Sequence, residues 1–237
     1  MDLYDIHTHD AVTPSADDDG VPWQRLHYIL NVYPLGFEYA KDSELCTWFS
    51  CGVHPWYSED AEPQLKFLQE IANDPRIIAI GETGLDRLKG PGLQIQEAVF
   101  LKQIELSEKL HKPLIIHCVK AWDELLHIKK TVKPYQPWII HGYRGKPELT
   151  RQLLSHGFFF SVGDKFNPDS VNEIPIDRLF CETDVSDTPL VDVYSKIADC
   201  LGIPLEILAR HIQENVINIF KLPAINMPSK EAMPVGE

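Results

Sequence analysis

Eight short apolar runs, spaced through 237 residues, are the feature that most limits how this chain can fold. Each run has the length of a strand, is rich in β-branched or aromatic residues, and shows no clean alternation of apolar and polar positions. Strands without that alternation are buried on both faces, as in a parallel sheet covered by helices. The runs are residues 3–6, 28–32, 48–53, 77–80, 114–116, 138–140, 158–162 and 179–181.

Helical periodicity separates the later runs. Apolar residues recur at helical spacing through 95–110, 190–201 and 205–219, and shorter helices are predicted over 62–72, 121–130 and 147–156. Eight strands with intervening helices predict an α/β fold, a TIM-type (β/α)8 barrel, with an open α/β sheet as the alternative. Because residues 10–26 have the composition of a loop and 34–46 hold at most a short helix, we expect the first two crossover helices to be short or degenerate.

No repeat, low-complexity tract or linker divides the chain, so we predict a single barrel domain over residues 1–222. Residues 223–237, which include Pro223, Pro228 and Pro234, are expected to be a disordered tail. Five cysteines without a CxxC pair indicate reduced thiols, and the acidic first residues do not resemble a signal peptide. We therefore expect a cytoplasmic protein without membrane association or an obligate protein partner.

The net charge of −13 argues against a protein whose main role is to coat nucleic acid, because that binding depends on Lys and Arg that neutralise phosphates. The same charge is compatible with an enzyme that takes a strand end into a local site. Divalent cations bound in such a site would change the field there.

Polar side chains follow the apolar runs at their carboxyl ends, the face on which barrel enzymes place their active sites. His7 and His9 lie two residues apart at the end of the first run, so both imidazoles point to one face and can reach one metal ion. Taken singly, each such residue has an ordinary structural explanation. Together, four histidines and two carboxylates at one end of five strands predict a metal site. The six candidates are His7, His9, Glu82, His117, His141 and Asp184.

The order of these motifs resembles the TatD-like metal-dependent hydrolases, a branch of the amidohydrolase superfamily. The matching segments are HTH at 7–9, GVHPW at 52–56, GETGLD at 81–86, PLIIHC at 113–118, IIHG at 139–142, ETD at 182–184 and the segment 211–220. The resemblance implies a barrel with one or two divalent metal ions (Zn, Mg or Mn). It also implies hydrolysis of phosphodiester bonds, often in DNA, by a metal-activated water.

Carried over residue by residue, the resemblance also assigns roles. Asp184 and Glu82 would be the catalytic residues, with Asp184 orienting the attacking water or accepting its proton. His54 and Asp86 would contact substrate or support the metal ligands, although a loop hydrogen bond and a helix cap explain them equally well. The implied ligand set is His7 and His9 with Asp184 for one ion, His117 and His141 for the second, and Glu82 as the bridge.

The chain departs from the family pattern on the loops that would contact substrate. The family usually has Arg two residues after the strand-five histidine, where this chain has Val119. Basic residues after strands four to seven would form a cationic rim at the active-site face. We interpret Arg144 as the substrate-binding residue that replaces the missing arginine. The simpler explanation of these basic residues is that they are solvated charges on loops. The rim consists of Arg87, Lys89, Lys120, Arg144, Lys146 and Lys165. Trp56, Trp122 and Tyr143 also follow strands and either pack there or stack on a base.

The leading functional prediction is a metal-dependent phosphodiesterase, a deoxyribonuclease acting on single-stranded DNA or strand ends. The alternative is a small-substrate hydrolase of the same superfamily acting on an amide, lactone or phosphoester, which the acidic charge and Val119 favour. A catalytically inert metal-binding protein is the third hypothesis, and the complete ligand set disfavours it.

Overall fold

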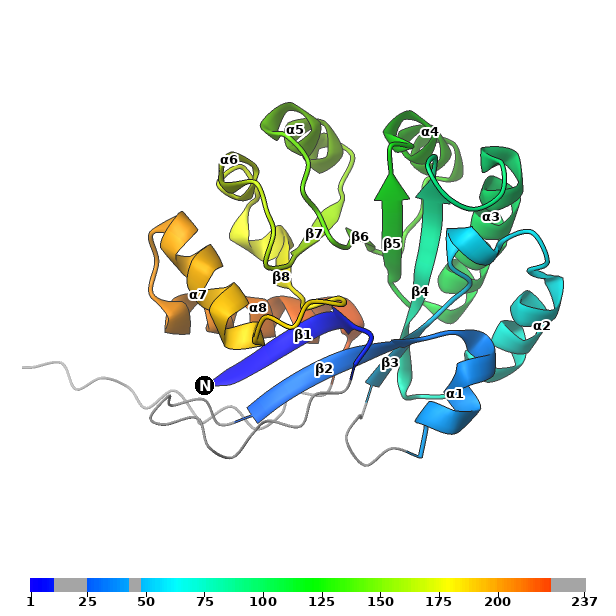
Figure 1. The fold of residues 1–237 in the computed structure, drawn as a ribbon, viewed down its shortest axis with the longest axis horizontal. Coiled ribbons are helices and arrows are strands. Elements are labelled where there is room, and N and C mark those ends of the chain that lie inside the picture. The colour runs from blue at the N-terminus through cyan, green and yellow to red at the C-terminus, as the bar shows by residue number, and fades with distance from the viewer. Residues whose placement is uncertain (11–24, 43–47, 223–237) are drawn as a thin grey trace, which may run out of the picture.

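Eight parallel strands form one sheet in the order β1 to β8, and the sheet curls into a nearly closed barrel with the helices outside it (Figure 1). The structure, a computed structural model, describes residues 1–10, 25–42 and 48–222. A parallel bridge between Thr8 and Asp184 joins the first strand to the segment after the last one. The strands are β1 (Asp2–Thr8), β2 (Arg25–Val32), β3 (Trp48–Cys51), β4 (Ile77–Asp86), β5 (Leu114–Val119), β6 (Trp138–Ile140), β7 (Phe159–Val162) and β8 (Leu179–Cys181).

The helices predicted from the periodicity are present, either between the later strands or, for the last two, after β8, and the TIM-type barrel is confirmed. Helix α1 has seven residues, which is the short helix expected in the second crossover. Most of the first crossover, residues 11–24, and the predicted tail, residues 223–237, lie outside the described residues. The helices are α1 (Pro34–Ala40), η1 (Pro55–Tyr57), α2 (Glu62–Ile71), α3 (Leu93–Leu110), α4 (Trp122–Val132), α5 (Pro147–Ser155), α6 (Pro168–Val171), η2 (Ile176–Arg178), α7 (Leu190–Leu201) and α8 (Leu205–Phe220).

Most of the strands are buried on both faces, which explains why their sequences lack an alternating pattern, whereas β2 is only partly buried. All ten residues of β4 are buried, and the short strands β6 and β8 are buried throughout. Cys51, Cys118 and Cys181 are buried free thiols and Cys200 is a partly buried one, while Cys46 lies outside the described residues. Among the helices that the structure describes, none combines the length and apolar character needed to cross a membrane.

Strand β4 extends beyond its apolar run through the whole GETGLD motif. Residues 81–86 are part of β4, which pairs with β5 as far as Asp86 and Val119. Gly84 permits that pairing, because a Cβ at this position would lie 2.1 Å from the carbonyl oxygen of His117. Glu82 therefore projects from inside a strand, where the backbone holds it in place.

Candidate metal centre

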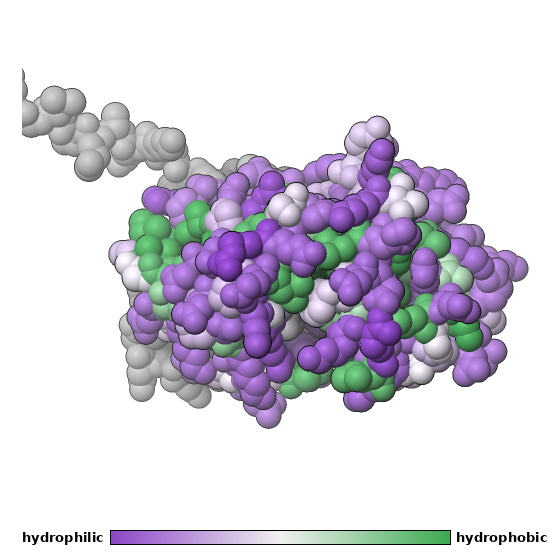
Figure 2. Space-filling view, turned by 90° about the horizontal axis from the view of Figure 1, so that it is seen from above, coloured by the Kyte–Doolittle hydropathy of each residue, from purple (hydrophilic) through white to green (hydrophobic). Residues whose placement is uncertain are grey.

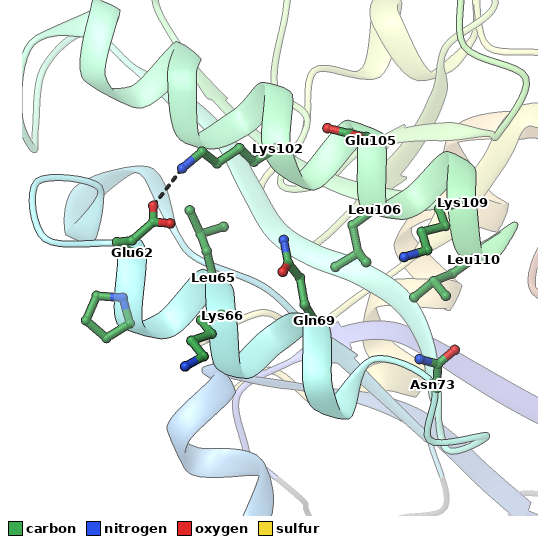
Figure 3. Close-up of a pocket in the computed structure, with 11 residues that line it drawn as sticks. Glu62, Leu65, Lys66, Gln69, Asn73, Lys102, Glu105, Leu106, Lys109 and Leu110 are labelled. Carbon is green, nitrogen blue, oxygen red and sulfur yellow. Dashed lines mark hydrogen bonds and ion pairs between the residues drawn. The ribbon is translucent and has the colours of Figure 1, made fainter.

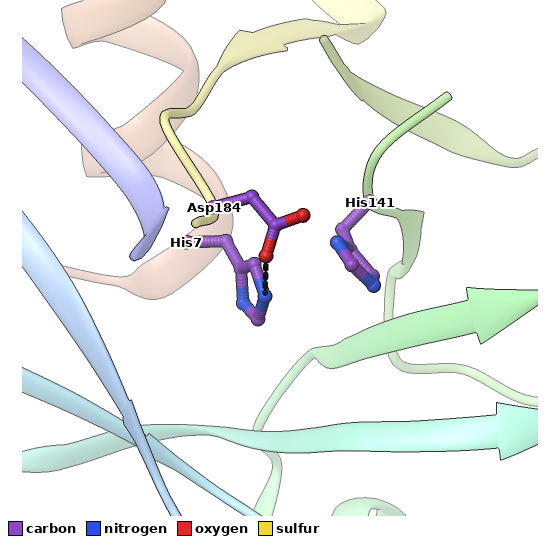
Figure 4. Close-up of side chains that lie close together, drawn as sticks. All are labelled: His7, His141 and Asp184. Atoms are coloured by element: carbon purple, nitrogen blue, oxygen red, sulfur yellow. Dashed lines mark ion pairs between the residues drawn. The ribbon is translucent and has the colours of Figure 1, made fainter. Parts of the chain in front are cut away.

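The structure brings all six predicted ligands together at the mouth of the barrel, and His54 joins them. The side chains come from β1, β4 and β5 and from the residues that follow β1, β3, β6 and β8. Three overlapping groups could each hold an ion. They are His7, His9 and Glu82; His7, His141 and Asp184; and His54, Glu82 and His117. Figure 4 shows the second group, in which Asp184 and His141 converge on His7 from separate segments.

Two imidazoles and two carboxylates surround one point at the His7 side of the cluster. The Nε2 atom of His7 lies 3.7 Å from Glu82 Oε2 and 3.7 Å from Asp184 Oδ1. The Nε2 atom of His9 lies 3.6 Å from each of the same two oxygens. These distances are too long for hydrogen bonds. They leave room for a cation at the ~2.0–2.2 Å that Zn²⁺ keeps from nitrogen and oxygen ligands.

The state of His7 fits a metal ligand. Its side chain is fully buried, and neither ring nitrogen has a hydrogen-bond partner among the described residues. Burial holds the pKa of His7 well below its usual value, so the imidazole is neutral. A neutral imidazole with a free nitrogen is the form that binds metals.

The other oxygen of Glu82 faces a second set of histidines. Glu82 Oε1 lies 2.7 Å from His141 Nε2, 2.9 Å from His117 Nδ1 and 3.2 Å from His54 Nε2. Burial alone would raise the pKa of Glu82, but His141, His117 and His54 outweigh it and hold the pKa well below its usual value. The carboxylate is thus ionised, and its two oxygens face different sets of ligands, as those of a bridging carboxylate must.

His141 lies between the two halves of the cluster. Its ring centroid is 4.2 Å from that of His7 and 5.6 Å from that of His117. The resemblance paired His141 with His117, whereas the grouping by distance places it with His7 and Asp184. The geometry therefore offers His141 to either ion.

Asp86 and His54 are buried, and their contacts support neighbouring site residues. Asp86 Oδ2 accepts the indole N–H of Trp56 at 2.6 Å and lies 3.1 Å from His117 Nε2. His54 Nδ1 accepts the backbone N–H of Trp56 at 3.1 Å, which leaves Nε2 directed at Glu82. Of the two roles expected for Asp86, these contacts favour orientation of His117 over contact with substrate.

Sequence reasoning missed three polar residues that hold the site. Asn31 Oδ1 accepts the backbone N–H of Glu82 at 2.8 Å. Asp5 accepts the N–H of His7 at 3.1 Å and the hydroxyl of Thr183 at 2.6 Å, and burial raises its pKa to about 7. Glu182 is fully buried, accepts the N–H of Gly142 and lies 3.6 Å from His141 Nδ1.

A period of two could have found one of these residues. Asp5 shares a strand face with His7, because side chains two apart on a strand point the same way. Glu182 gives no such signal, because it follows β8 and Asp184 has a left-handed backbone with a φ of 57°. Asn31 has no comparable signal, since its partner lies 51 positions away in the chain.

The predicted cationic rim is only partly free to meet a ligand. Arg87 is paired with Glu124, and Lys89 lies over the ring of Trp56 at 4.2 Å. Arg144 and Lys165 instead line a pocket of about 520 Å³, together with Lys196, which the sequence did not suggest. None of these three cations forms an ion pair with another described residue.

A larger pocket of about 710 Å³ lies on the outside of the barrel between α2 and α3 (Figure 3). Its lining mixes both charges, with Lys102 bonded to Glu62 at 2.6 Å, and contains no predicted site residue. In the view of Figure 2, hydrophilic residues cover most of the visible surface and hydrophobic ones form small separate groups. The mouth of the barrel is therefore the place where chemistry-bearing side chains gather.

The sequence is similar to that of known metal-dependent hydrolases. Residues 34–221 match the model of a family described as TatD related DNase. An Escherichia coli protein named as an uncharacterized metal-dependent hydrolase, YcfH, is 28% identical over 203 residues, covering 76% of each chain. A protein of Erwinia billingiae named as the 3'-5' ssDNA/RNA exonuclease TatD is 28% identical over 207 residues, covering 75% of this chain and 78% of that one.

The fold is also similar to that of solved structures. The crystal structure of YJJV, a TatD homologue from Escherichia coli, superposes with a TM-score of 0.77. It covers 93% of this chain and 98% of that protein at 20% sequence identity. This likeness is one of fold, and it extends over the whole barrel.

Proposed function

The chain belongs to the TatD-related DNase family and is a metal-dependent hydrolase, and on that premise we propose that it cleaves phosphodiester bonds of single-stranded DNA at accessible strand ends. The observation that carries the proposal is that the two carboxylate oxygens of Glu82 face two different groups of histidines. One oxygen faces His7 and His9 and the other faces His117 and His141. A bridging carboxylate of this kind suits two ions roughly 3.5–4 Å apart, the spacing found in two-metal phosphodiesterases.

The proposed ligands are His7, His9, Glu82 and Asp184 for one ion and Glu82, His117 and His141 for the other. Imidazole and carboxylate donors suit Zn and Mn, and the carboxylates also admit Mg. Bound divalent ions would supply Lewis-acid stabilisation of phosphoryl charge and a lowered pKa for water.

Asp184 is the residue we assign to proton transfer. Its backbone is fixed on both sides, because its N–H donates to the carbonyl of His7 at 2.9 Å and its carbonyl accepts the N–H of His9 at 3.1 Å. Its side chain is 26% exposed, in contrast to the buried Glu82, so it can reach a water or a substrate at the mouth. Burial raises the pKa of Asp184, which favours acceptance of a proton from the attacking water.

Arg144 and its pocket supply the phosphate contact that the family places two residues after the strand-five histidine. Arg144 follows His141 by three residues, and Lys165 follows β7, so both lie on the carboxyl face with the metal centre. Three cations against the single acid Asp164 give this pocket a positive charge on a protein of net charge −13. A guanidinium with free donors is well suited to phosphate oxygens.

The test is hydrolysis of an end-labelled single-stranded oligonucleotide by chelator-stripped protein, titrated separately with Mg, Mn and Zn. Metal-dependent shortening of the strand, abolished in His117→Ala, is the expected result. Arg144→Ala should lower kcat/KM, and the slope of log kcat/KM against log salt concentration should become shallower by about 0.7 for each phosphate that Arg144 neutralises. Lys130→Ala, an exposed cation on α4, is the matched control and should change neither.

The alternative of a small-substrate hydrolase is an outcome of the same experiment. Stoichiometric binding of ions without cleavage of any oligonucleotide would refute the nuclease proposal. Hydrolysis of a lactone, amide or phosphomonoester should then be measured with the same His117→Ala control.

A further inference from the structure

Three aromatic side chains stand half-exposed beside the metal centre and outside the core. Tyr33 directly follows β2, while Trp56 and Tyr57 lie in η1, which follows β3. They are 38%, 37% and 49% exposed, respectively. None of the three belongs to the apolar core formed by the described residues, or packs against it as a partly buried member. Burial in the apolar core therefore does not account for the position of these three rings.

The two tyrosines form a pair that reaches the metal ligands through His54. The rings of Tyr33 and Tyr57 meet edge-on, with centroids 5.5 Å apart and planes at 87°. The ring of Tyr57 is 6.1 Å from that of His54, whose Nε2 is 3.2 Å from Glu82 Oε1. One imidazole thus separates the pair from the carboxylate that would bridge the ions.

Trp56, next to Tyr57 in η1, is fixed in place by several contacts. Its indole N–H donates to Asp86 at 2.6 Å, and the ammonium of Lys89 lies 4.2 Å above its ring. Its ring meets that of His54 edge-on at 4.6 Å. Because these contacts occupy much of Trp56, the two tyrosines offer the freer aromatic surface.

We propose that Tyr33 and Tyr57, backed by Trp56, form a stacking platform for the nucleobase next to the scissile phosphate, so that the site selects unpaired bases. The inference rests on the proposed function and goes beyond it by naming what recognises the base. Aromatic rings stack on any base with little sequence preference, and the bases of a duplex are paired and stacked on one another, so only a single strand can use such a platform.

The platform and the cationic pocket lie on opposite sides of the mouth. Tyr33 and Tyr57 follow β2 and β3, whereas Arg144 and Lys165 follow β6 and β7, four positions further round the ring of strands. A strand laid across the mouth would place a base on the tyrosines, a phosphate at the metal centre and a neighbouring phosphate in the pocket of Arg144, Lys165 and Lys196. Base contact and phosphate contact are thereby separated in space.

Binding measurements test the platform without relying on cleavage. Fluorescence anisotropy of a short labelled single strand is measured in an Asp184→Asn background with Mn²⁺ present, using an ordinary strand and one with abasic residues at its end. Tyr57→Leu and Tyr33→Leu are each expected to weaken binding of the ordinary strand about 5- to 150-fold, the effect of losing one stacked base. The same variants should bind the abasic strand as the parent does, and Tyr57→Phe should retain full binding.

Tyr135→Leu is the matched control, because Tyr135 is 94% exposed and lies before β6, at the opposite end of the barrel. In the protein with Asp184 intact, Tyr57→Leu should raise KM and leave kcat nearly unchanged. Equal affinity of parent and Tyr57→Leu for the ordinary strand, or an equal loss on both strands, would overturn the platform.

The failure of the platform and that of the proposed function are distinguishable. Cleavage by the wild type with no effect of either tyrosine leaves the nuclease intact and refutes the platform. Binding that depends on the tyrosines and on the base, without cleavage, supports the platform and refutes the nuclease. A parent protein that binds neither strand refutes both.

Discussion

Glu182 supports the metal centre from behind, and its replacement by glutamine isolates that role. The side chain is fully buried, accepts the N–H of Gly142 and lies 3.6 Å from Nδ1 of His141. On its other side, His141 presents Nε2 to Glu82 at 2.7 Å. Glu182→Gln keeps the size of the side chain and an oxygen for Gly142 but removes the negative charge.

The expected loss can be bounded from the geometry. Two unit charges 3.6 Å apart attract by about 4–5 kcal/mol at an effective dielectric constant of 20, which is an upper value because a metal-bound imidazole carries only part of a charge. A carboxylate behind a ligating histidine usually changes metal affinity about 10- to 100-fold. We therefore expect Glu182→Gln to weaken metal binding by that factor, equivalent to about 1.4–2.7 kcal/mol.

The protein without metal should respond much less. The lost attraction between Glu182 and His141 is opposed by relief of repulsion, since Glu182 also raises the pKa values of Asp5 and Asp184 beyond the effect of burial. We expect the free energy of unfolding without metal to change by less than about 1 kcal/mol. With saturating metal, the variant should lose about 1.4–2.7 kcal/mol of stability, because weaker binding stabilises the folded state less.

Titration calorimetry of chelator-stripped protein with Mn²⁺ and with Zn²⁺ measures the affinity, and urea unfolding with and without metal measures the stability. Glu70→Gln, at an exposed position of α2, is the matched control and should alter neither. Unchanged metal affinity in Glu182→Gln would refute the reasoning. An equal loss of stability with and without metal would show instead that Glu182 serves only the fold.

Three further predictions concern the scaffold. Gln103→Leu should lower the free energy of unfolding, measured in urea, by about 3–5 kcal/mol. The Gln103 amide hydrogen-bonds to both the N–H and the carbonyl of Val53, at 2.8 and 3.0 Å, and its removal leaves both buried groups unpaired. A loss under 1 kcal/mol would contradict this reasoning. Burial lowers the pKa of Lys129 to about 8, so folding opposes its charge. Lys129→Met should therefore be more stable than the wild type at pH 7. This advantage should shrink as the pH rises from 8 towards 10.5, because the folded wild type then releases its proton before the unfolded chain does. Urea unfolding measures the difference across that range, and a difference that stays constant with pH would disprove the prediction. Gly52→Ala should lower the free energy of unfolding, followed by thermal unfolding, by about 1–3 kcal/mol, because the added Cβ would lie 2.8–2.9 Å from backbone atoms of Gly81. An unchanged Tm would argue against that close approach.

The strand-end histidines were predictable because of a general property of parallel barrels. The carboxyl ends of all strands meet at one mouth, so His7, His117 and His141 had to lie near one another once the strands were identified. The apolar runs located all eight strands, since strands buried on both faces contain little else. Local composition was enough for this part of the fold.

The apolar runs gave no sign of the supporting residues. Asp5 lies within the first predicted run and within β1, but a single polar residue there does not reveal its role. Its partner is remote in the chain: the hydroxyl of Thr183 bonds to Asp5 across 178 positions. Nothing local marks such a pair, because only the closure of the barrel brings the first and last strands together.

The site also conflicts with the stability of the fold that carries it. Glu182 is fully buried and raises the pKa values of Asp5 and Asp184 beyond the effect of burial, so these carboxylates repel one another. His141 and His117 offset the burial of Glu82, but His7 is kept neutral by burial and contributes no charge. A buried carboxylate without a cation is costly, whereas a divalent ion removes the cost for several at once. Metal binding should therefore stabilise the mouth of the barrel above all. We expect removal of the metal to affect the apolar cluster of Trp138, Phe100 and Phe158 less than the mouth, because this cluster contains no carboxylate.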